Sequence, residues 1–401
     1  MSEWKEYKFS DLLIDQSISY GIVQPGTHTD TDSVPIIRVN NIRNGRFKID
    51  DVLKVSSVIE QKYKRTRLSG GELLITVVGS VGECAIVPSY LSGWNVARAV
   101  SVARIREGFD KRFIKYCFSS EDLRFQMYGN TNDTVQPTLN LSLLKELVLT
   151  IPPLPEQKAI AQVLSSLDDK IDLLHRQNKT LEAIAETLFR QWFIEEAQDD
   201  WEEKSLLDVI QVVNGGTPKT SIPEYWNGEF FWLSGGDISS NHKSFIISSA
   251  KTITQKGLDH SSAKLLPKFA TVITARGTVG KYALLSKPIA YSQSNFGILP
   301  GIEGCFFFTY LLVNHVVREL QSAAYGSVFD TITATTFREI EVTVPSVKEV
   351  EEFEKSVSPY FLKKLHCLTQ IQTLEKLRDT LLPKLMSGEV RVAVEPDLEA
   401  A

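Results

Sequence analysis

The sequence predicts a mixed α+β protein in which two similar α/β domains are separated by two long helices. Three observations support this prediction. Motifs recur in the same order at offsets of 193 to 198 residues, short β-like runs between turn residues fill the first part of each half, and a 4,3 spacing of apolar residues follows. We expect the two helices to pair as an antiparallel coiled coil, which would give the chain a pseudo-two-fold internal repeat.

The composition is typical of a soluble globular chain that is long enough for two or three domains. The chain has 401 residues, of which 43% are hydrophobic and 23% charged, and a formal net charge of -5. Its most apolar stretch, residues 305–317, is interrupted by polar residues and is shorter than the roughly 20 residues that a membrane-spanning helix needs. The first residues mix acids with bases and lack the apolar core of a signal peptide. We therefore expect a cytoplasmic protein with no membrane contact.

Four motifs are present in both halves of the chain. They follow one another in the same order, while the sequence between them differs freely. This pattern indicates two copies of one scaffold that carry different surfaces. The matched pairs are residues 4–12 with 201–209, 74–82 with 272–280, 128–129 with 325–326, and 144–152 with 337–345.

The repeat and the changes of apolar spacing set the expected domain boundaries. We expect domains at 1–150 and 199–345, helical spacers at 151–198 and 346–395, and a tail at 396–401. Within the domains we expect strands in the apolar runs, and one helix in each domain. The expected strands include residues 34–39, 73–78 and 271–274, and the expected helices are residues 111–128 and 306–322.

The apolar spacing after Pro155 alternates between four and three residues, as it does along a coiled-coil seam. Asn178 fills one step of this seam, and Lys364 and Arg378 are exceptions in its second copy. A helix of about 36 residues is roughly 54 Å long, which indicates a spacer. The seam positions are Ile160, Leu164, Leu167, Ile171, Leu174, Leu181, Ala185, Leu188 and Trp192, then Phe353, Val357, Tyr360, Cys367, Ile371, Leu374, Leu381 and Leu385. We expect the acids of the outer face to be solvated or to receive partner helices; they are Asp168, Asp169, Asp172, Glu182, Glu186, Glu195 and Glu196.

The sequence contains no recognisable active site. Residues 277–282 resemble the end of a phosphate-binding loop, but Ala275 stands where the first glycine is required and Tyr282 replaces Ser or Thr. The six histidines never fall at metal-ligand spacing, and the four cysteines lie at least 33 positions apart with no C-x-x-C pair. We therefore expect neither a zinc site nor a disulfide framework.

Several blocks of the sequence resemble the DNA-specificity subunit of type I restriction-modification systems. The resemblance covers essentially the whole chain. In the second copy of the proline-rich block, residues 344–350, one proline is kept and the glutamine is absent. The blocks are QPTLN at 136–140, IPPLPEQ at 151–157, LDDKID at 167–172, LFRQWF at 188–193, GGTP at 215–218, WLSGGDI at 232–238, ARGTVGK at 275–281 and RDTLLPKLMSGE at 378–389.

This resemblance implies two target-recognition domains, a bipartite site on double-stranded DNA, and no catalysis by the chain itself. It implies two methyltransferase (modification) subunits as partners, together with translocase-nuclease (restriction) subunits. S-adenosylmethionine, ATP and magnesium would then belong to those partners, and this chain would hold no cofactor.

Two basic islands are the candidates for DNA contact. Residues 38–67 contain nine bases and three acids, and residues 243–281 contain seven bases and one acid. Lysine and arginine bind phosphates, whereas arginine reads guanine and asparagine or glutamine reads adenine. The candidates are Arg38, Asn40, Asn41, Arg43, Lys62, Lys64, Arg65 and Arg67 in the first domain, and Ser234, Asp237, Asn241, His242, Lys243, Arg276 and Lys281 in the second. Glycines 79, 82, 277 and 280 either take part in this contact or only form a tight hairpin. On the long helix, Ala159 and Ile184 are the candidates for contact with a partner subunit.

Two other classes of protein stay open at this stage. A nonspecific nucleic-acid-binding protein would bind DNA in a salt-dependent way without sequence preference. A coiled-coil scaffold for proteins would not bind DNA at all.

Overall fold

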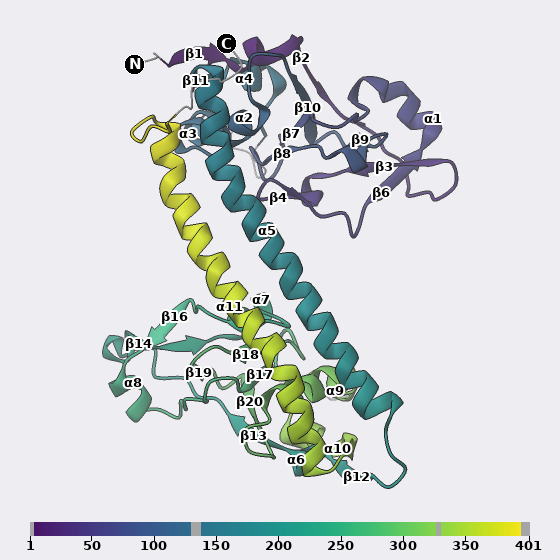
Figure 1. The fold of residues 1–401 in the computed structure, drawn as a ribbon, viewed down its shortest axis with the longest axis vertical. Coiled ribbons are helices and arrows are strands. Elements are labelled where there is room, and N and C mark those ends of the chain that lie inside the picture. The colour runs from purple at the N-terminus through teal and green to yellow at the C-terminus, as the bar shows by residue number, and fades with distance from the viewer. Residues whose placement is uncertain (1–3, 130–137, 326–329, 394–401) are drawn as a thin grey trace, which may run out of the picture. The chain divides into compact units, whose positions relative to one another are not determined.

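The computed structural model describes residues 4–129, 138–325 and 330–393 (Figure 1). Gln136, Pro137, Gly326 and the tail at 396–401 lie outside the described residues. The chain divides into two compact units, residues 1–170 with 374–401 (unit 1) and residues 171–373 (unit 2). Each long helix is shared between the units, so the domain boundaries drawn from the sequence stay predictions. Within the described ranges, no helix is both long and apolar enough to cross a membrane.

Unit 1 is built on a four-stranded antiparallel sheet in the order β2-β10-β7-β8. A second sheet has the order β6-β3-β9, in which β3 and β9 run parallel. Two further antiparallel pairs are β1 with β11 and β4 with β5. The strands are β1 (Lys5–Lys8), β2 (Leu13–Tyr20), β3 (Ser33–Ile37), β4 (Ile42–Arg43), β5 (Arg46–Phe47), β6 (Leu53–Ser56), β7 (Leu73–Thr76), β8 (Cys84–Ile86), β9 (Asn95–Val96), β10 (Val100–Ile105) and β11 (Val148–Ile151).

Unit 2 repeats this strand order. Its main sheet is β13-β20-β17-β18, to which β15 adds a fifth strand parallel to β18. Its second sheet is β16-β14-β19 with β14 parallel to β19, and β12 pairs with β21. The strands are β12 (Glu202–Ser205), β13 (Ile210–Asn214), β14 (Trp226–Leu233), β15 (Phe245–Ile246), β16 (Lys251–Ile253), β17 (Thr271–Thr274), β18 (Tyr282–Leu285), β19 (Ala290–Tyr291), β20 (Asn295–Pro300) and β21 (Glu341–Val344). The predicted mixed fold with an internal repeat is confirmed.

The short helices begin where polar residues cap them. Asn140 accepts a hydrogen bond from the backbone N–H of Leu143 at the start of α4, and Thr333 accepts one from Thr336 at the start of α10. Such caps satisfy N–H groups that have no partner inside the helix. The short helices are α1 (Ser57–Glu60), α4 (Leu141–Glu146), α6 (Leu206–Val209), α7 (Gly235–Ser240), α8 (Gln255–Asp259) and α10 (Ala334–Glu339).

The prediction of a single helix at residues 111–128 is wrong. The structure has α2 (Lys111–Cys117) and α3 (Glu121–Gly129), with a break at residues 118–120. Ser120 causes the break locally, because its hydroxyl accepts a hydrogen bond from the N–H of Leu123 and donates one to the carbonyl of Cys117. The counterpart in unit 2 is one continuous helix, α9 (Phe306–Tyr325).

The two spacers are the long helices α5 (Leu154–Arg190) and α11 (Val347–Met386). A π-helical turn, Gln191–Glu195, follows α5, and Gly388 ends the second helix with a positive φ of 75°. Within each unit the two helices pack antiparallel. In unit 1 Asp168 contacts Arg378, and in unit 2 Gln177 contacts Cys367 and Glu182 contacts Lys364.

The 4,3 seam breaks down at the end of α5 and at the start of α11, both of which lie in unit 2. At the end of α5 the buried residues are Ala185, Phe189 and Phe193, in place of the expected Leu188 and Trp192. At the start of α11 they are Phe353, Val357 and Phe361, in place of Tyr360. The spacing becomes four because these turns pack into the core of a sheet domain and not only against each other.

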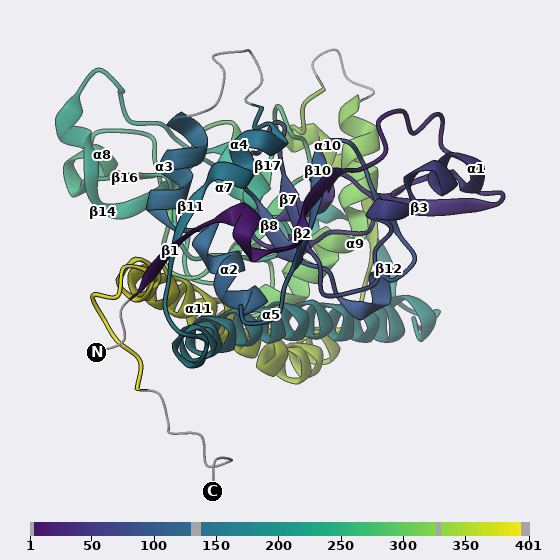
Figure 2. The ribbon, with the colours of Figure 1, turned by 90° about the horizontal axis from the view of Figure 1, so that it is seen from above.

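Each unit has one main core that the sheet domain and the helix pair build together. In unit 1, Phe113 of α2 and Leu144 of α4 share a cluster with Ile160, Leu164 and Leu385 of the long helices. In unit 2, the apolar face of α9 shares a cluster with the apolar turns of the long helices described above. In each unit the sheets and short helices lie on one side of the helix pair (Figure 2).

The two charged exceptions in the seam of α11 are paired with acids of α5. The guanidinium of Arg378 donates to Asp168 at 3.0 Å, and buried Lys364 forms an ion pair with Glu182. A tyrosine of the sheet domain completes each group, since the hydroxyl of Tyr116 donates to Asp168 at 2.7 Å and that of Tyr310 to Glu182 at 2.8 Å. The expectation that these two acids are solvated is wrong. Glu186 stays 35% exposed and also accepts from Asn314 at 2.8 Å.

Candidate nucleic-acid interface

The first group of candidates lies on the loop that follows β3 in unit 1. Asn44 and Gly45 form the two-residue turn between β4 and β5, and both have a positive φ, of 52° and 70°. This is the backbone geometry that Asn-Gly favours in a tight hairpin. Asn40 and Arg43 are exposed beside this turn, so their side chains are free to meet a ligand.

Two residues of the same loop are engaged within it. Asn41 is 2% exposed; its carbonyl oxygen accepts from the N–H of Arg38 at 2.9 Å, and its amide donates to the carbonyls of Lys48 and Asp51, each at 2.9 Å. Arg38 donates to the carboxylate of Asp51 at 3.2 Å. Asn41 therefore shapes the loop from inside, and the exposed surface of the loop belongs to its neighbours.

The second group in unit 1 lies on a short 3-10 helix, η3 (Gln61–Thr66). Lys62, Lys64 and Arg65 are exposed there. Arg67 follows the helix and forms an ion pair with Glu60, whose side chain is 1% exposed. Three of the four candidates in this group are thus exposed to solvent, whereas Arg67 is paired with a buried acid.

In unit 2, Ser234 and Asp237 build the start of α7. The hydroxyl of Ser234 accepts from the N–H of Asp237 at 3.3 Å, and the carboxylate of Asp237 accepts from the N–H of Ser234 at 2.8 Å and from that of Ala250 at 3.0 Å. This reciprocal arrangement is a capping box. Asn241 ends the helix and donates to the carbonyl of Asp237 at 2.8 Å. These three side chains hold the loop together.

The structure brings the end of this loop against β18. A ring nitrogen of His242 lies 3.3 Å from the backbone N and O of Tyr282, and the N–H of Lys243 donates to the same carbonyl at 2.9 Å. Burial, and after it the charge of Lys281, lowers the pKa of His242 below its ordinary value. His242 is therefore neutral near pH 7. The Lys243 ammonium pairs with Glu186 at 2.9 Å.

The glycine motif forms the same tight hairpin in both units. In unit 1 the hydroxyl of Thr76 accepts from the N–H of Glu83 at 3.0 Å, and in unit 2 that of Thr274 accepts from Lys281 at 2.9 Å. All four glycines of these two turns have a positive φ. The side chains around the turns differ: Arg276 is exposed beside the second turn, where the first has a valine.

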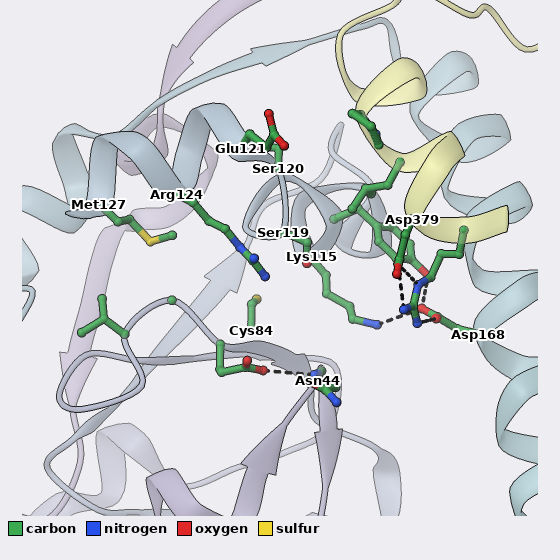
Figure 3. A pocket seen from close by; sticks show the side chains of 18 of the residues that line it. Asn44, Cys84, Lys115, Ser119, Ser120, Glu121, Arg124, Met127, Asp168 and Asp379 are labelled. Carbon is green, nitrogen blue, oxygen red and sulfur yellow. Dashed lines mark hydrogen bonds and ion pairs between the residues drawn. The ribbon is translucent and has the colours of Figure 1, made fainter. Parts of the chain in front are cut away.

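A pocket of about 510 Å³ lies in unit 1 between the sheet domain and the helix pair (Figure 3). Lys115 and Arg124 line it, and both lie outside the two basic islands of the sequence. Asp168 lies at its edge; burial acts to raise the pKa of this carboxyl, but the Tyr116 hydroxyl and nearby cations hold it below its ordinary value. Cys84 lies in the wall, and burial raises the pKa of its thiol to about 12, so the thiol is not a nucleophile at neutral pH. Among the described residues, no cluster of His, Cys, Asp or Glu could hold a metal ion.

The two residues predicted to meet a partner subunit lie on the outer surface of α5. Ala159 is half-buried and Ile184 is 37% exposed. An exposed isoleucine next to acids is compatible with a further helix packing there, but isolated apolar side chains are also common on ordinary surfaces.

The chain is similar to known proteins over nearly its full length. The family model described as "Type I restriction modification DNA specificity domain" matches residues 1–183 and again 198–376. The HindI specificity subunit of Haemophilus influenzae is 23% identical over 97% of this chain and 100% of its own length. The MjaIX specificity subunit of Methanocaldococcus jannaschii is 26% identical over 80% of this chain and 78% of its own length. The solved structure of a type I restriction-modification S subunit from M. genitalium has the same fold, with a TM-score of 0.61, 17% identity and 96% of both chains covered.

Proposed function

Because the chain belongs to the family of type I restriction-modification DNA specificity domains, we propose that it recognises a bipartite site on double-stranded DNA and directs modification and restriction subunits to it. As a specificity subunit it supplies DNA sequence recognition and no catalysis. The methyl transfer and the cleavage would be carried out by the partners, and S-adenosylmethionine, ATP and magnesium would be bound by them.

The main support for a bipartite site is the pair of matched hairpins, which carry different side chains. The two units share one strand order and the same threonine-to-backbone hydrogen bonds at the turn. Around that turn Val78 and Glu83 in unit 1 correspond to Arg276 and Lys281 in unit 2. Since direct readout depends on which donors and acceptors reach the base edges, equal scaffolds with different loops favour two different half-sites.

We assign the exposed cations, together with half-buried Lys281, to phosphate contacts and the exposed loop residues to base contacts. Lys62, Lys64 and Arg65 would bind phosphates in one half, and Arg276 and Lys281 in the other. Arg43 and Asn40 at the β4–β5 hairpin are the strongest candidates for base reading, because they are exposed beside a rigid turn. Arg38, Asn41, Ser234, Asp237, Asn241, His242 and Lys243 would support these loops through the contacts described above.

We propose two methyltransferase subunits as partners of the long helices. The outer faces of α5 and α11, including Ala159 and Ile184, would receive partner helices and complete a four-helix bundle. Co-purification should then give one copy of this chain with two of the partner, and a chain that stays monomeric beside its methyltransferase would contradict this.

The test is to map methylated adenines in cells that carry the partner subunits, with and without this chain. The proposal predicts methylation at one bipartite motif with an unread gap, and its loss when the chain is deleted. A continuous motif would contradict the bipartite site. DNA binding without sequence preference would favour a nonspecific binder, and a complex that binds no DNA would favour a protein scaffold.

A further inference from the structure

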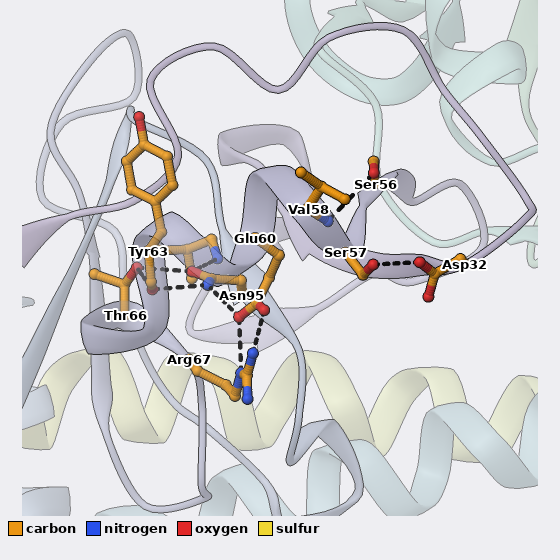
Figure 4. Close-up of polar contacts among 10 residues, drawn as sticks. Asp32, Ser56, Ser57, Val58, Glu60, Tyr63, Thr66, Arg67 and Asn95 are labelled. Carbon is orange, nitrogen blue, oxygen red and sulfur yellow. Dashed lines mark hydrogen bonds and ion pairs between the residues drawn. The ribbon is translucent and has the colours of Figure 1, made fainter.

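The basic helix η3 is held to the body of unit 1 by buried side chains, and Figure 4 shows this network. The carboxylate of Glu60 accepts two hydrogen bonds from the guanidinium of Arg67, one of them from Nε at 2.7 Å. It also accepts from the amide of Asn95 at 3.0 Å. A two-point contact between guanidinium and carboxylate fixes orientation as well as distance. Because Glu60 is the last residue of α1 and Arg67 follows η3, this contact ties together the two ends of the basic helix.

Asn95 connects the same acid to the middle of η3. Its side chain is fully buried; the amide donates to the carbonyl of Tyr63 at 3.1 Å, and the carbonyl oxygen accepts from the hydroxyl of Thr66 at 2.8 Å. Tyr63 is the residue at which η3 is kinked, with φ of -119° and ψ of 31°. The kink is therefore stabilised by the side chain of Asn95 on β9, which also donates a hydrogen bond to Glu60.

A second arginine holds the far end of the segment. Arg104 of β10 donates to the carbonyl of Arg65 at 3.1 Å and to that of Arg67 at 3.0 Å. It is anchored in turn by Glu72, which is 4% exposed, at 3.4 Å. Carbonyls at the end of a helix usually meet solvent, and here a side chain of the sheet satisfies them.

In the part of the chain that the structure describes, the side chains of the three cations on η3 form no hydrogen bond with this network, although the charge of Lys64 contributes to lowering the pKa of Glu60. Lys62, Lys64 and Arg65 are exposed, and in the described part of the chain none of them forms an ion pair with an acid. The segment thus has a fixed backbone and an outer row of charged side chains. Arg67 differs from them because its charge is already matched by a buried carboxylate.

We propose that Glu60 is a positioning residue for DNA binding, which through Arg67 and Asn95 holds η3 so that Lys62, Lys64 and Arg65 meet adjacent phosphates. Arg67 acts as a strut in this arrangement and does not contact phosphate. The proposal rests on the proposed function, and it adds an acid to a surface whose other members are bases.

The proposal predicts that loss of the Glu60 carboxylate weakens DNA binding, whereas simple electrostatics predicts that it strengthens binding. Removal of a carboxylate near DNA reduces repulsion and should strengthen binding if Glu60 has no positioning role. If Glu60 holds η3, the variant E60Q should weaken binding about tenfold and reduce the salt dependence by about one phosphate contact or more, since each contact contributes roughly 0.9 to the slope. R67K keeps the charge but loses the two-point contact, so it should weaken binding in the same way.

The experiment measures binding of the full chain, in the complex in which it purifies, to a duplex carrying the mapped site and to an unrelated duplex of equal length. E60Q, R67K, the triple variant K62A/K64A/R65A and the quadruple variant with E60Q are compared at several salt concentrations. E60Q should have no further weakening effect in the triple background, because it acts through the missing cations. E107Q, which alters an exposed acid just after β10 in the same unit, is the control, and thermal unfolding checks that each variant is folded.

The outcomes distinguish failure of the positioning role of Glu60 from failure of DNA binding by this surface. If the triple variant weakens binding while E60Q and R67K leave it unchanged or strengthen it, the positioning role is overturned. An E60Q effect of equal size in both backgrounds would also overturn it. If the triple variant binds the mapped duplex as tightly as the unaltered chain, DNA binding by this surface fails and the proposed function must be revised. R67K keeps the test decisive should E60Q fail to fold.

Discussion

At the scale of single residues, one acid takes over a role that the repeat assigns to a glutamine. In unit 1 the side chain of Gln157 on α5 accepts from the N–H of Asp110, at the start of α2, at 2.8 Å. In unit 2 the carboxylate of Glu354 on α11 accepts from the N–H groups of Phe307 and Phe308, at the start of α9, at 3.1 and 2.8 Å. The second proline-rich block has no glutamine at the matching position. Glu354, one turn further along α11, caps the start of α9 in its place.

The half-buried position of Glu354 predicts a pH dependence of stability. Burial raises the pKa of this carboxyl to about 7, against the hydrogen bonds from α9 that lower it. The folded chain therefore holds this proton more tightly than the unfolded chain, so the contribution to stability is present at low pH and is lost as pH rises toward and through 7. Between pH 5 and 8 the free energy of unfolding should fall by up to about 3 kcal/mol from this group.

Denaturant unfolding of the full chain at several pH values tests this expectation. E354Q should flatten the pH dependence, because glutamine caps without a charge, as Gln157 does in the other unit. E351Q on the same helix is the matched control and should leave the slope unchanged. An E354Q variant with the slope of the unaltered chain would show that another group is responsible.

At the scale of elements, charge distinguishes the two long helices from each other. The acids at the helix contacts, Asp168 and Glu182, lie on α5, and their partners Arg378 and Lys364 lie on α11. Burial lowers the pKa of Lys364, and the ammonium also donates to the carbonyl of Lys243 at 2.7 Å. An acid on one helix and a base on the other favour pairing of α5 with α11 over pairing of either helix with a copy of itself.

A charge exchange tests this reading. K364E should destabilise unit 2 by about 3–5 kcal/mol, because it places two carboxylates together in a buried site. The double variant E182K/K364E should recover at least half of that loss by restoring an ion pair with reversed polarity. Thermal unfolding of the single and double variants measures both effects, and a double variant as unstable as K364E alone would refute the pairing role. The exposed lysine Lys363, changed to Glu on the same helix, is the control.

At the scale of the whole molecule, two units of one topology each contain their own core. The sheet domain of each unit packs with its own turns of the long helices. Differences between the halves include loops, such as the turn after β7 and the turn after β17. This organisation separates what holds the molecule together from what would contact DNA.

The independence of the units predicts the result of a domain exchange. Replacing residues 1–150 with the equivalent domain of a relative should change one half of the methylated motif and leave the other half as it was. The physical reason is that the side chains proposed to read bases, and the hydrogen bonds that would support them, lie within one unit. Methylation mapping with the exchanged chain provides the readout, and the reciprocal exchange of residues 199–345 is the control. An exchange that altered both half-sites, or neither, would contradict the proposal.

The sequence alone determined the features that depend on local pattern. The repeat, the mixed fold, the long helices and the tight turns all follow from the spacing of apolar residues and glycines, which act on the neighbouring backbone. The two basic islands can also be identified from the sequence, because a cluster of lysines and arginines is visible without knowledge of which residues they contact.

The tertiary structure decided which polar side chains are free and which are occupied. Asn41 and Arg67 look like DNA contacts in the sequence, yet one is saturated within its loop and the other is tied to Glu60. The seam exceptions Lys364 and Arg378 pair with acids on the other long helix, about two hundred residues earlier in the chain. Such pairings follow from long-range packing, where a buried charge is stable only if the fold brings its partner to it, and no local pattern records which partner that will be.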